Sequence, residues 1–149
     1  MQIHALKLGH PLWEKVISFA SESSWSAGPS LAKMMRNNSF TDCERVFAAL
    51  EGEKIAGFAL FSEKDGMPKE LDHYTPFVGY LFVDEAFRGQ RISEKIIAQV
   101  KDYAKEIGYP ALYLKTDHRG LYEKYGFVQV CEFTPIPGTT SDQLFKIDL

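Results

Sequence analysis

The stretch that decides the fold runs from Phe77 to Phe127 and reads FVGYLFVDEAFRGQRISEKIIAQVKDYAKEIGYPALYLKTDHRGLYEKYGF. Its first part, up to Val83, is apolar or aromatic almost without a break, which is typical of a strand covered on both faces. Regular alternation places one set of side chains on one face and the rest on the other: Phe77, Gly79, Leu81 and Val83 against Val78, Tyr80 and Phe82. We therefore predict a central strand of a sheet.

A basic turn and an amphipathic helix follow this strand. The turn reads Arg88-Gly89-Gln90-Arg91-Ile92-Ser93, and Gly108 and Pro110 end the helix. Apolar residues recur at helical spacing between these limits: Ile92, Ile96, Ile97, Val100, Ala104 and Ile107. The first turn of a helix carries unpaired N–H groups and the positive end of the macrodipole, so the sequence predicts an anion site there.

The side chains of the turn suit a phosphate ligand. Arg88 and Arg91 offer forked donors, Ser93 offers a hydroxyl, and Gly89 lets a ligand approach the backbone. A pyrophosphate fits this chemistry. The ordinary alternative is a surface turn with two solvated arginines.

A second strand and a tyrosine-bearing segment complete the stretch. Residues Ala111 to Thr116 read as a strand parallel to the first, joined to it by the helix. A short helix ended by Gly126 then leads into a strand from Phe127 to Phe133. Ligands of such units lie beyond the carboxyl ends of the strands, so Tyr122 is expected to return to that crevice.

Two of these motifs resemble those of the GNAT superfamily of acyl-CoA-dependent N-acyltransferases. One is the pyrophosphate turn, Arg88 to Ser93, after a strand ending Leu81-Phe82-Val83; the other is Tyr122-Glu123-Lys124-Tyr125-Gly126-Phe127. Arg91 stands where the family has its second glycine. The resemblance implies a layered α+β fold: a mixed, mostly antiparallel sheet with a splayed parallel strand pair and about four helices.

The resemblance also implies an activity, transfer of an acetyl group from acetyl-CoA to a primary amine of a small molecule or protein in a ternary complex. By analogy the pyrophosphate binds the turn residues Arg88, Gly89, Gln90, Arg91, Ile92 and Ser93, and the pantetheine arm binds along Leu81, Phe82 and Val83. Acetyl-CoA is the only cosubstrate implied, without a metal. Tyr122 is expected to act as general acid at the leaving sulfur; its ordinary alternative is a packed tyrosine.

The base that deprotonates the amine is less well marked, because the strand from Phe77 to Val83 contains no acidic residue. His118 is the best candidate, since it follows the second strand and histidine titrates near neutral pH, although an exposed loop histidine is the ordinary alternative. The other candidates are His73, Glu63 and Asp84.

Recognition of the acceptor is expected from two variable segments. One is the connector around Trp25, and the other is the loop with Asp72, His73 and Tyr74. The acidic Glu70 and Asp72 would suit a cationic acceptor, although solvated loop charges are the default.

The flanking sequence predicts the same architecture. We expect strands at Gln2 to Leu8, Arg45 to Glu51, Lys54 to Ser62 and Leu144 to Leu149, and helices beginning near Pro11 and at Ser30. The chain has 149 residues and shows no repeat or linker, so we expect a single domain, residues 1–149.

Composition excludes several other classes. A net charge of −3 without a long basic run argues against nucleic-acid binding, and two distant cysteines do not make a disulfide scaffold or zinc site. No apolar stretch predicts a membrane span or signal peptide, so a cytoplasmic protein is expected. A homodimer is left open. The remaining alternatives are a non-catalytic acyl-CoA-binding regulatory module and a site for another phosphorylated ligand.

Overall fold

The computed structural model describes residues 1–149, and its elements follow the predicted order. The strands are β1 (Gln2–Leu6), β2 (Arg45–Glu51), β3 (Lys54–Ser62), β4 (Phe77–Val83), β5 (Ala111–Thr116), β6 (Val128–Phe133) and β7 (Asp142–Asp148). The α-helices are α1 (Trp13–Glu22), α2 (Gly28–Arg36) and α3 (Ile92–Glu106), with short 3-10 helices η1 (Lys69–Leu71), η2 (Glu85–Phe87) and η3 (Tyr122–Tyr125). The short helix predicted before Gly126 is thus a 3-10 helix.

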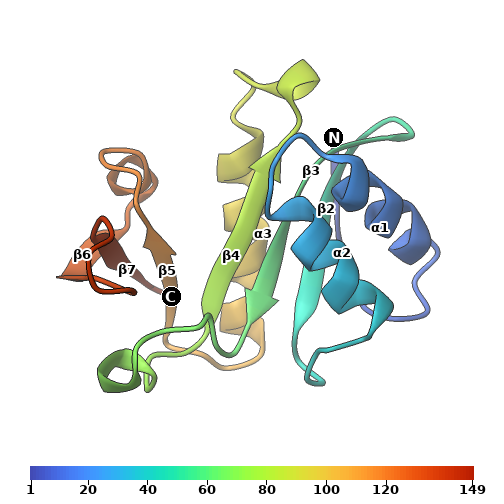
Figure 1. Ribbon diagram of the computed structural model, residues 1–149. Helices are drawn as coiled ribbons and strands as arrows, with labels where there is room; N and C mark the ends of the chain where they lie inside the picture. The colour runs from blue at the N-terminus through green and yellow to red at the C-terminus, as the bar shows by residue number, and fades with distance from the viewer.

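The strands form one seven-stranded sheet in the order β1-β2-β3-β4-β5-β7-β6. Every neighbouring pair is antiparallel except β4 and β5, which are parallel. Figure 1 shows β5, β7 and β6 as a group set apart from β4. The predicted mixed sheet with one parallel pair is confirmed, with three α-helices rather than about four.

Each face of the sheet carries its own apolar core, with α1 and α2 on one side and α3 on the other (Figure 1). The α3 core contains Ile92, Ile96 and Val100, the same residues that define the helical spacing in the sequence. The other core packs helix residues such as Val16 and Leu31 against the strands. None of the helices combines the length and apolar character that crossing a bilayer requires.

The predicted regular alternation of side chains along β4 is wrong, because the strand contains a β-bulge. Phe82 pairs with Phe58 and Gly79 pairs with Leu60, so two residues, Tyr80 and Leu81, stand opposite one residue of β3. Tyr80 has φ of 50°, in the left-handed region. Because of the extra residue, each later side chain of β4 lies on the face opposite to the one that regular alternation predicts.

Because of this reversal, Val78 shares the α3 core with Leu81 and Val83, although strict alternation assigned it to the opposite face. Tyr80 and Phe82 pack on the side of α1 and α2. Sequence periodicity could not reveal the bulge. A positive φ is usually signalled by a glycine, and position 80 holds a tyrosine.

The parallel pair β4 and β5 touches only at its beginning. Phe77 and Tyr113 form the single register pair, supported by a 2.9 Å hydrogen bond from the Tyr113 N–H to the Pro76 carbonyl. Beyond that point the two strands separate. The predicted splay is therefore present, and it leaves backbone groups of β4 without a partner strand.

The turn before α3 owes its shape to Arg91, the residue that precedes the helix. Arg91 has φ of 58° and ψ of 32°, a left-handed conformation that favours glycine, and its side chain makes no capping hydrogen bond. The first helical hydrogen bond runs from Lys95 N–H to the Arg91 carbonyl, at 3.2 Å. The amides of Ile92, Ser93 and Glu94 are consequently unpaired within the helix.

The left-handed conformation at position 91 predicts a stabilising substitution. Arg91→Gly should raise the free energy of unfolding by about 1 kcal/mol, because glycine adopts this conformation without steric cost. Chemical denaturation would measure the change. Arg91→Ala is the matched control: it removes the same charge but keeps a Cβ, so it should give no such gain. Equal effects of the two variants would contradict the prediction.

Candidate active site

A cleft of about 840 Å³ occupies the space where β4 and β5 separate. Its walls are β4 from Val78 to Val83, the end of β5 with the residues that follow it, and the connector between α1 and α2. The lining residues beyond β4 are Ser24, Trp25, Glu85, Arg88, Leu114, Lys115, Thr116, Asp117, His118, Tyr122 and Asp142. The structure thus brings Leu81, Phe82, Val83, Arg88, Tyr122 and His118 of the predicted site together in one cleft.

Tyr122 has the properties of a proton donor. Its side chain is buried and packs edge-on against Tyr125 and Phe127, with ring centroids 6.0 and 6.2 Å away. The Tyr122 hydroxyl makes no hydrogen bond. Because every fully buried polar side-chain atom has a hydrogen-bond partner, this hydroxyl is not fully buried, and it is accessible from the cleft that Tyr122 lines. Burial, with Tyr125 and Asp117 nearby, raises the pKa of Tyr122 to about 12, which keeps the phenol protonated.

Arg88 lies at the mouth of the cleft, near the start of α3. Its Nε donates to the Val83 carbonyl at 3.1 Å, and its guanidinium carbon lies 6.0 Å from the centre of the Phe82 ring. The other turn residues, Gly89, Gln90 and Arg91, are exposed beyond the lining. The Ile92 side chain belongs to the α3 core, so only its backbone amide can meet a ligand.

A hydrogen bond joins the turn to the segment that carries Tyr122. The Ser93 hydroxyl lies 2.9 Å from the Tyr125 hydroxyl. Tyr125, in turn, packs on Tyr122. Tyr125 thus ties η3 to the first turn of α3, and this contact has no sequence signal.

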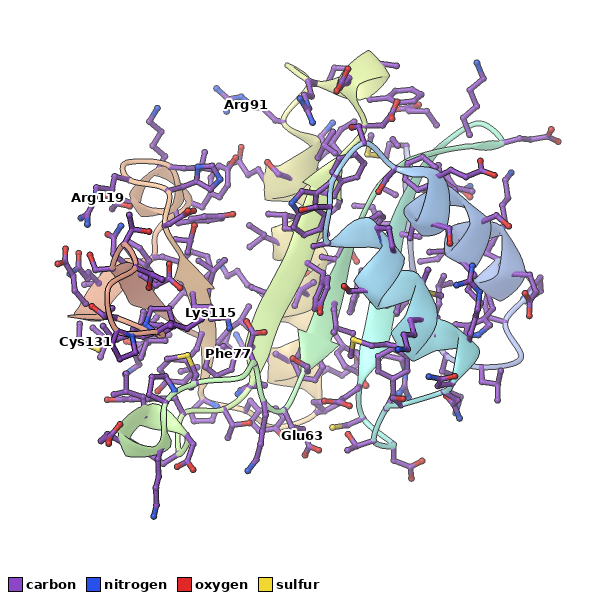
Figure 2. All side chains as sticks on the ribbon, viewed as in Figure 1. Glu63, Phe77, Arg91, Lys115, Arg119 and Cys131 are labelled. Carbon is purple, nitrogen blue, oxygen red and sulfur yellow. The ribbon has the colours of Figure 1, made fainter.

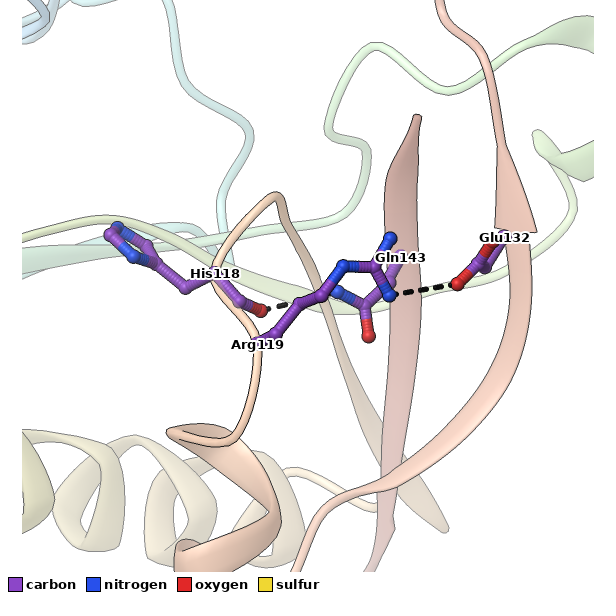
Figure 3. A network of polar contacts seen from close by, with 4 residues as sticks. All are labelled: His118, Arg119, Glu132 and Gln143. Carbon is purple, nitrogen blue, oxygen red and sulfur yellow. Dashed lines mark hydrogen bonds and ion pairs between the residues drawn. The ribbon is translucent and has the colours of Figure 1, made fainter. Parts of the chain in front are cut away.

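His118 is exposed in the loop after β5, at the edge of the cleft. The buried Gln143 donates to its backbone carbonyl at 3.2 Å, and the neighbouring Arg119 pairs with Glu132 at 2.9 Å. Figure 3 shows the imidazole turned away from these three side chains. The contacts therefore fix the loop backbone rather than the histidine ring, and the catalytic role of His118 stays a prediction.

The other predicted bases lie outside the cleft. Glu63, Asp72 and His73 line a separate hollow, and Figure 2 shows Glu63 beyond the end of the sheet at which Phe77 lies, opposite the end with Arg91. Asp84 caps η2, where its carboxylate accepts from the Ala86 N–H. Asp72 and His73, which the sequence suggested for acceptor recognition, thus do not line the cleft, because they lie in the hollow with Tyr109.

Trp25 lines the cleft as the sequence suggested. Its ring stacks on Phe82 with centroids 5.9 Å apart and meets Tyr80 edge-on at 6.1 Å. These rings form an aromatic wall of the cleft, to which the α1–α2 connector contributes Trp25 and β4 contributes Tyr80 and Phe82. Stacked aromatic rings attract both apolar groups and cations.

Sequence reasoning missed Asp65, an acidic residue whose titration the fold perturbs. Its side chain is only 18% exposed and lies 4.0 Å from the Lys115 ammonium. Burial raises the pKa of Asp65 from 3.8 to about 6, while the charge of Lys115 opposes the shift. Nothing in the sequence distinguishes Asp65 from the other acidic residues of its polar loop.

Residues 11–127 match the family model of the acetyltransferase (GNAT) family. This stretch includes the strand, the turn, α3 and the tyrosine segment described above. The chain belongs to the GNAT acetyltransferase family.

Individual relatives agree with this membership. The chain is 36% identical over 63 residues to acetyltransferase Atu2258 of Agrobacterium fabrum, a match covering 40% of this chain and 46% of that protein, less than half of its length. Aminoglycoside 6'-acetyltransferase type Ii has a similar fold, with a TM-score of 0.74 at 18% identity, over 99% of this chain and 97% of that one. A GNAT acetyltransferase from Elizabethkingia anophelis with acetyl-CoA bound has a TM-score of 0.62 at 20% identity, over the same 99% and 97%.

The partly buried Asp65 predicts a specific pH dependence of stability. Its pKa is higher in the folded chain than in the unfolded chain, so the stabilisation is present below about pH 4 and is lost as pH rises through 6. Relative to wild type, Asp65→Asn should gain roughly 3 kcal/mol of unfolding free energy across this window. Urea denaturation at several pH values measures the difference. The exposed Asp42→Asn is the control, and a constant Asp65→Asn difference across pH would refute the expectation.

Proposed function

We propose that the chain is an N-acetyltransferase that transfers the acetyl group of acetyl-CoA directly to a primary amine of a small molecule or protein. One observation carries the proposal: a single cleft joins Arg88 beside the unpaired amides of α3, the unpaired backbone of β4, and the protonated phenol of Tyr122. These three parts match the phosphate, amide and thioester regions of an acyl-CoA.

The residues at the start of α3 fit the pyrophosphate of the donor. The amides of Ile92, Ser93 and Glu94 have no helical partner and lie at the positive end of the helix macrodipole. The exposed guanidinium groups of Arg88 and Arg91 add positive charge beside them. Along β4, the backbone near Leu81 and Val83 offers the pantetheine amides the hydrogen bonds that β5 does not take up.

The chemistry at the reacting end follows from the state of Tyr122. Attack by the amine nitrogen on the thioester carbonyl forms the C–N bond, and the C–S bond then breaks with its electron pair left on sulfur. Tyr122 donates its phenol proton to that sulfur or stabilises the developing charge by a hydrogen bond. A phenol with a pKa of about 12 suits a donor better than a base, because it is fully protonated near neutral pH.

Structural neighbours support the choice of substrates. The Elizabethkingia protein of similar fold binds acetyl-CoA, and another neighbour is an aminoglycoside 6'-acetyltransferase. An amine-bearing small molecule is therefore the acceptor class we favour.

Two substitutions separate binding from chemistry. Tyr122→Phe should lower kcat about 100-fold or more with an unchanged Kd for acetyl-CoA, because it removes only the proton donor.

Arg88→Ala should raise the Kd for acetyl-CoA about 10-fold, because it removes a charged contact to phosphate. Calorimetry measures binding, and thiol release measures turnover with a diamine, a polyamine, an aminoglycoside, an amino acid and a lysine-containing peptide.

Matched controls lie outside the cleft. Tyr109→Phe loses the same hydroxyl in the separate hollow, and Arg36→Ala loses the same charge from the exposed end of α2, where it bonds Ser21. Both should behave as wild type. Binding of acetyl-CoA without turnover on any amine would favour a regulatory module instead, and absence of acetyl-CoA binding would overturn both readings.

A further inference from the structure

Asp65 does not itself line the cleft, but its carboxylate contacts two residues that do, Gly79 on β4 and Lys115 on β5. A Cβ added to Gly79, which lines the cleft, would lie 3.2 Å from the Asp65 Oδ2 atom. Lys115, which lines the cleft from β5, lies 4.0 Å from the other carboxylate oxygen. Figure 2 shows Lys115 near Phe77, toward the end where the strands converge and away from Arg91.

The absence of a side chain at position 79 opens the space that the carboxylate occupies. Gly79 directly precedes the bulge at Tyr80, and any larger residue there would press against Asp65. The carboxylate is thus held against the backbone of β4 at the point where that strand loses its parallel partner. The phosphate-binding turn lies at the other end of the same strand.

The surroundings of Asp65 do little to stabilise its charge. The ion pair of the carboxylate with Lys115 is at the 4.0 Å limit of such contacts, and the Asp65 side chain stays 18% exposed. The titratable groups that face Asp65 are Lys115 on β5 and Tyr80 on β4. Burial and the charge of Asp65 raise the pKa of Tyr80. A carboxylate held this way costs stability, and a structural role does not account for it.

We propose that Asp65 is the base that removes a proton from the acceptor amine, and that Lys115 is a positioning residue that holds the carboxylate at the edge of the cleft. This inference rests on the proposed acetyl transfer. It also assigns the acceptor class, a primary ammonium that enters beside the aromatic wall of Trp25 and Tyr80 and pairs with Asp65 before it is deprotonated.

The proton balance of the step is complete. Asp65 takes one proton from the ammonium and frees the nitrogen lone pair, which forms the C–N bond at the thioester carbonyl. The C–S bond breaks, and the sulfur takes a proton from Tyr122. The nitrogen loses its second proton as the amide forms, which restores the phenol, and Asp65 finally releases its proton to solvent. The products are the acetylated amine, the free thiol of CoA and one proton.

The pH dependence of kcat/KM tests the role of Asp65. Wild type should show an acidic limb near pH 6, set by ionisation of the carboxyl. Asp65→Asn should abolish that limb and lower kcat/KM at least 100-fold, while the Kd for acetyl-CoA stays within about twofold of wild type. The substrate is the amine of the panel above that gives the fastest thiol release.

A second variant separates a catalytic role from a structural one. Lys115→Met removes the charge that lowers the pKa of Asp65, so the acidic limb should move to higher pH without disappearing. If Asp65 and Lys115 formed only a structural pair, the acidic limb of the pH profile would stay in place in both Asp65→Asn and Lys115→Met. The exposed Asp42→Asn is the control and should keep the wild-type profile.

The outcomes distinguish this inference from the proposed function. If Asp65→Asn binds acetyl-CoA and keeps the wild-type rate and limb, Asp65 is not the base, although acetyl transfer stands. If His118→Ala alone removes the limb, the base is His118 and the inference is overturned. If wild type turns over none of the amines, acetyl transfer and the role of Asp65 both fall.

Discussion

The structure depends on the early separation of two parallel strands. β4 and β5 pair only at Phe77 and Tyr113, although both strands continue past that point in the middle of a seven-stranded sheet. Losing ladder hydrogen bonds in a sheet interior is unfavourable unless another group takes their place. Further along β4, the bulge at Tyr80 and Leu81 changes the face on which the following side chains lie.

This separation explains why the two ends of the site differ in chemistry. At the α3 end, the left-handed Arg91 exposes helix amides and positive charge, which suit phosphate. At the converging end, Gly79 makes room for the half-buried carboxylate of Asp65. In the proposed acetyl transfer, the α3 end would take the anionic donor and the converging end the cationic acceptor.

Contacts far apart in the sequence hold the two walls in register. The Ser93 hydroxyl lies within hydrogen-bond distance of the Tyr125 hydroxyl, and Tyr125 packs on Tyr122, so the turn before α3 and Tyr122 share one set of contacts. In the same wall as Tyr122, Gln143 of β7 fixes the loop backbone at His118. A change in the first turn of α3 can thus reach Tyr122 through a short chain of side chains.

The sequence by itself determined the order of elements, the helical face of α3 and the turn before it, because periodicity, glycine placement and turn chemistry act over short distances. Only the tertiary structure decided which face Val78 occupies, since a bulge at a tyrosine leaves no local signal. It alone also singled out Asp65 from the acidic residues of its loop. Burial and charge pairing arise from segments that meet only in the folded chain, and no spacing along the sequence encodes them.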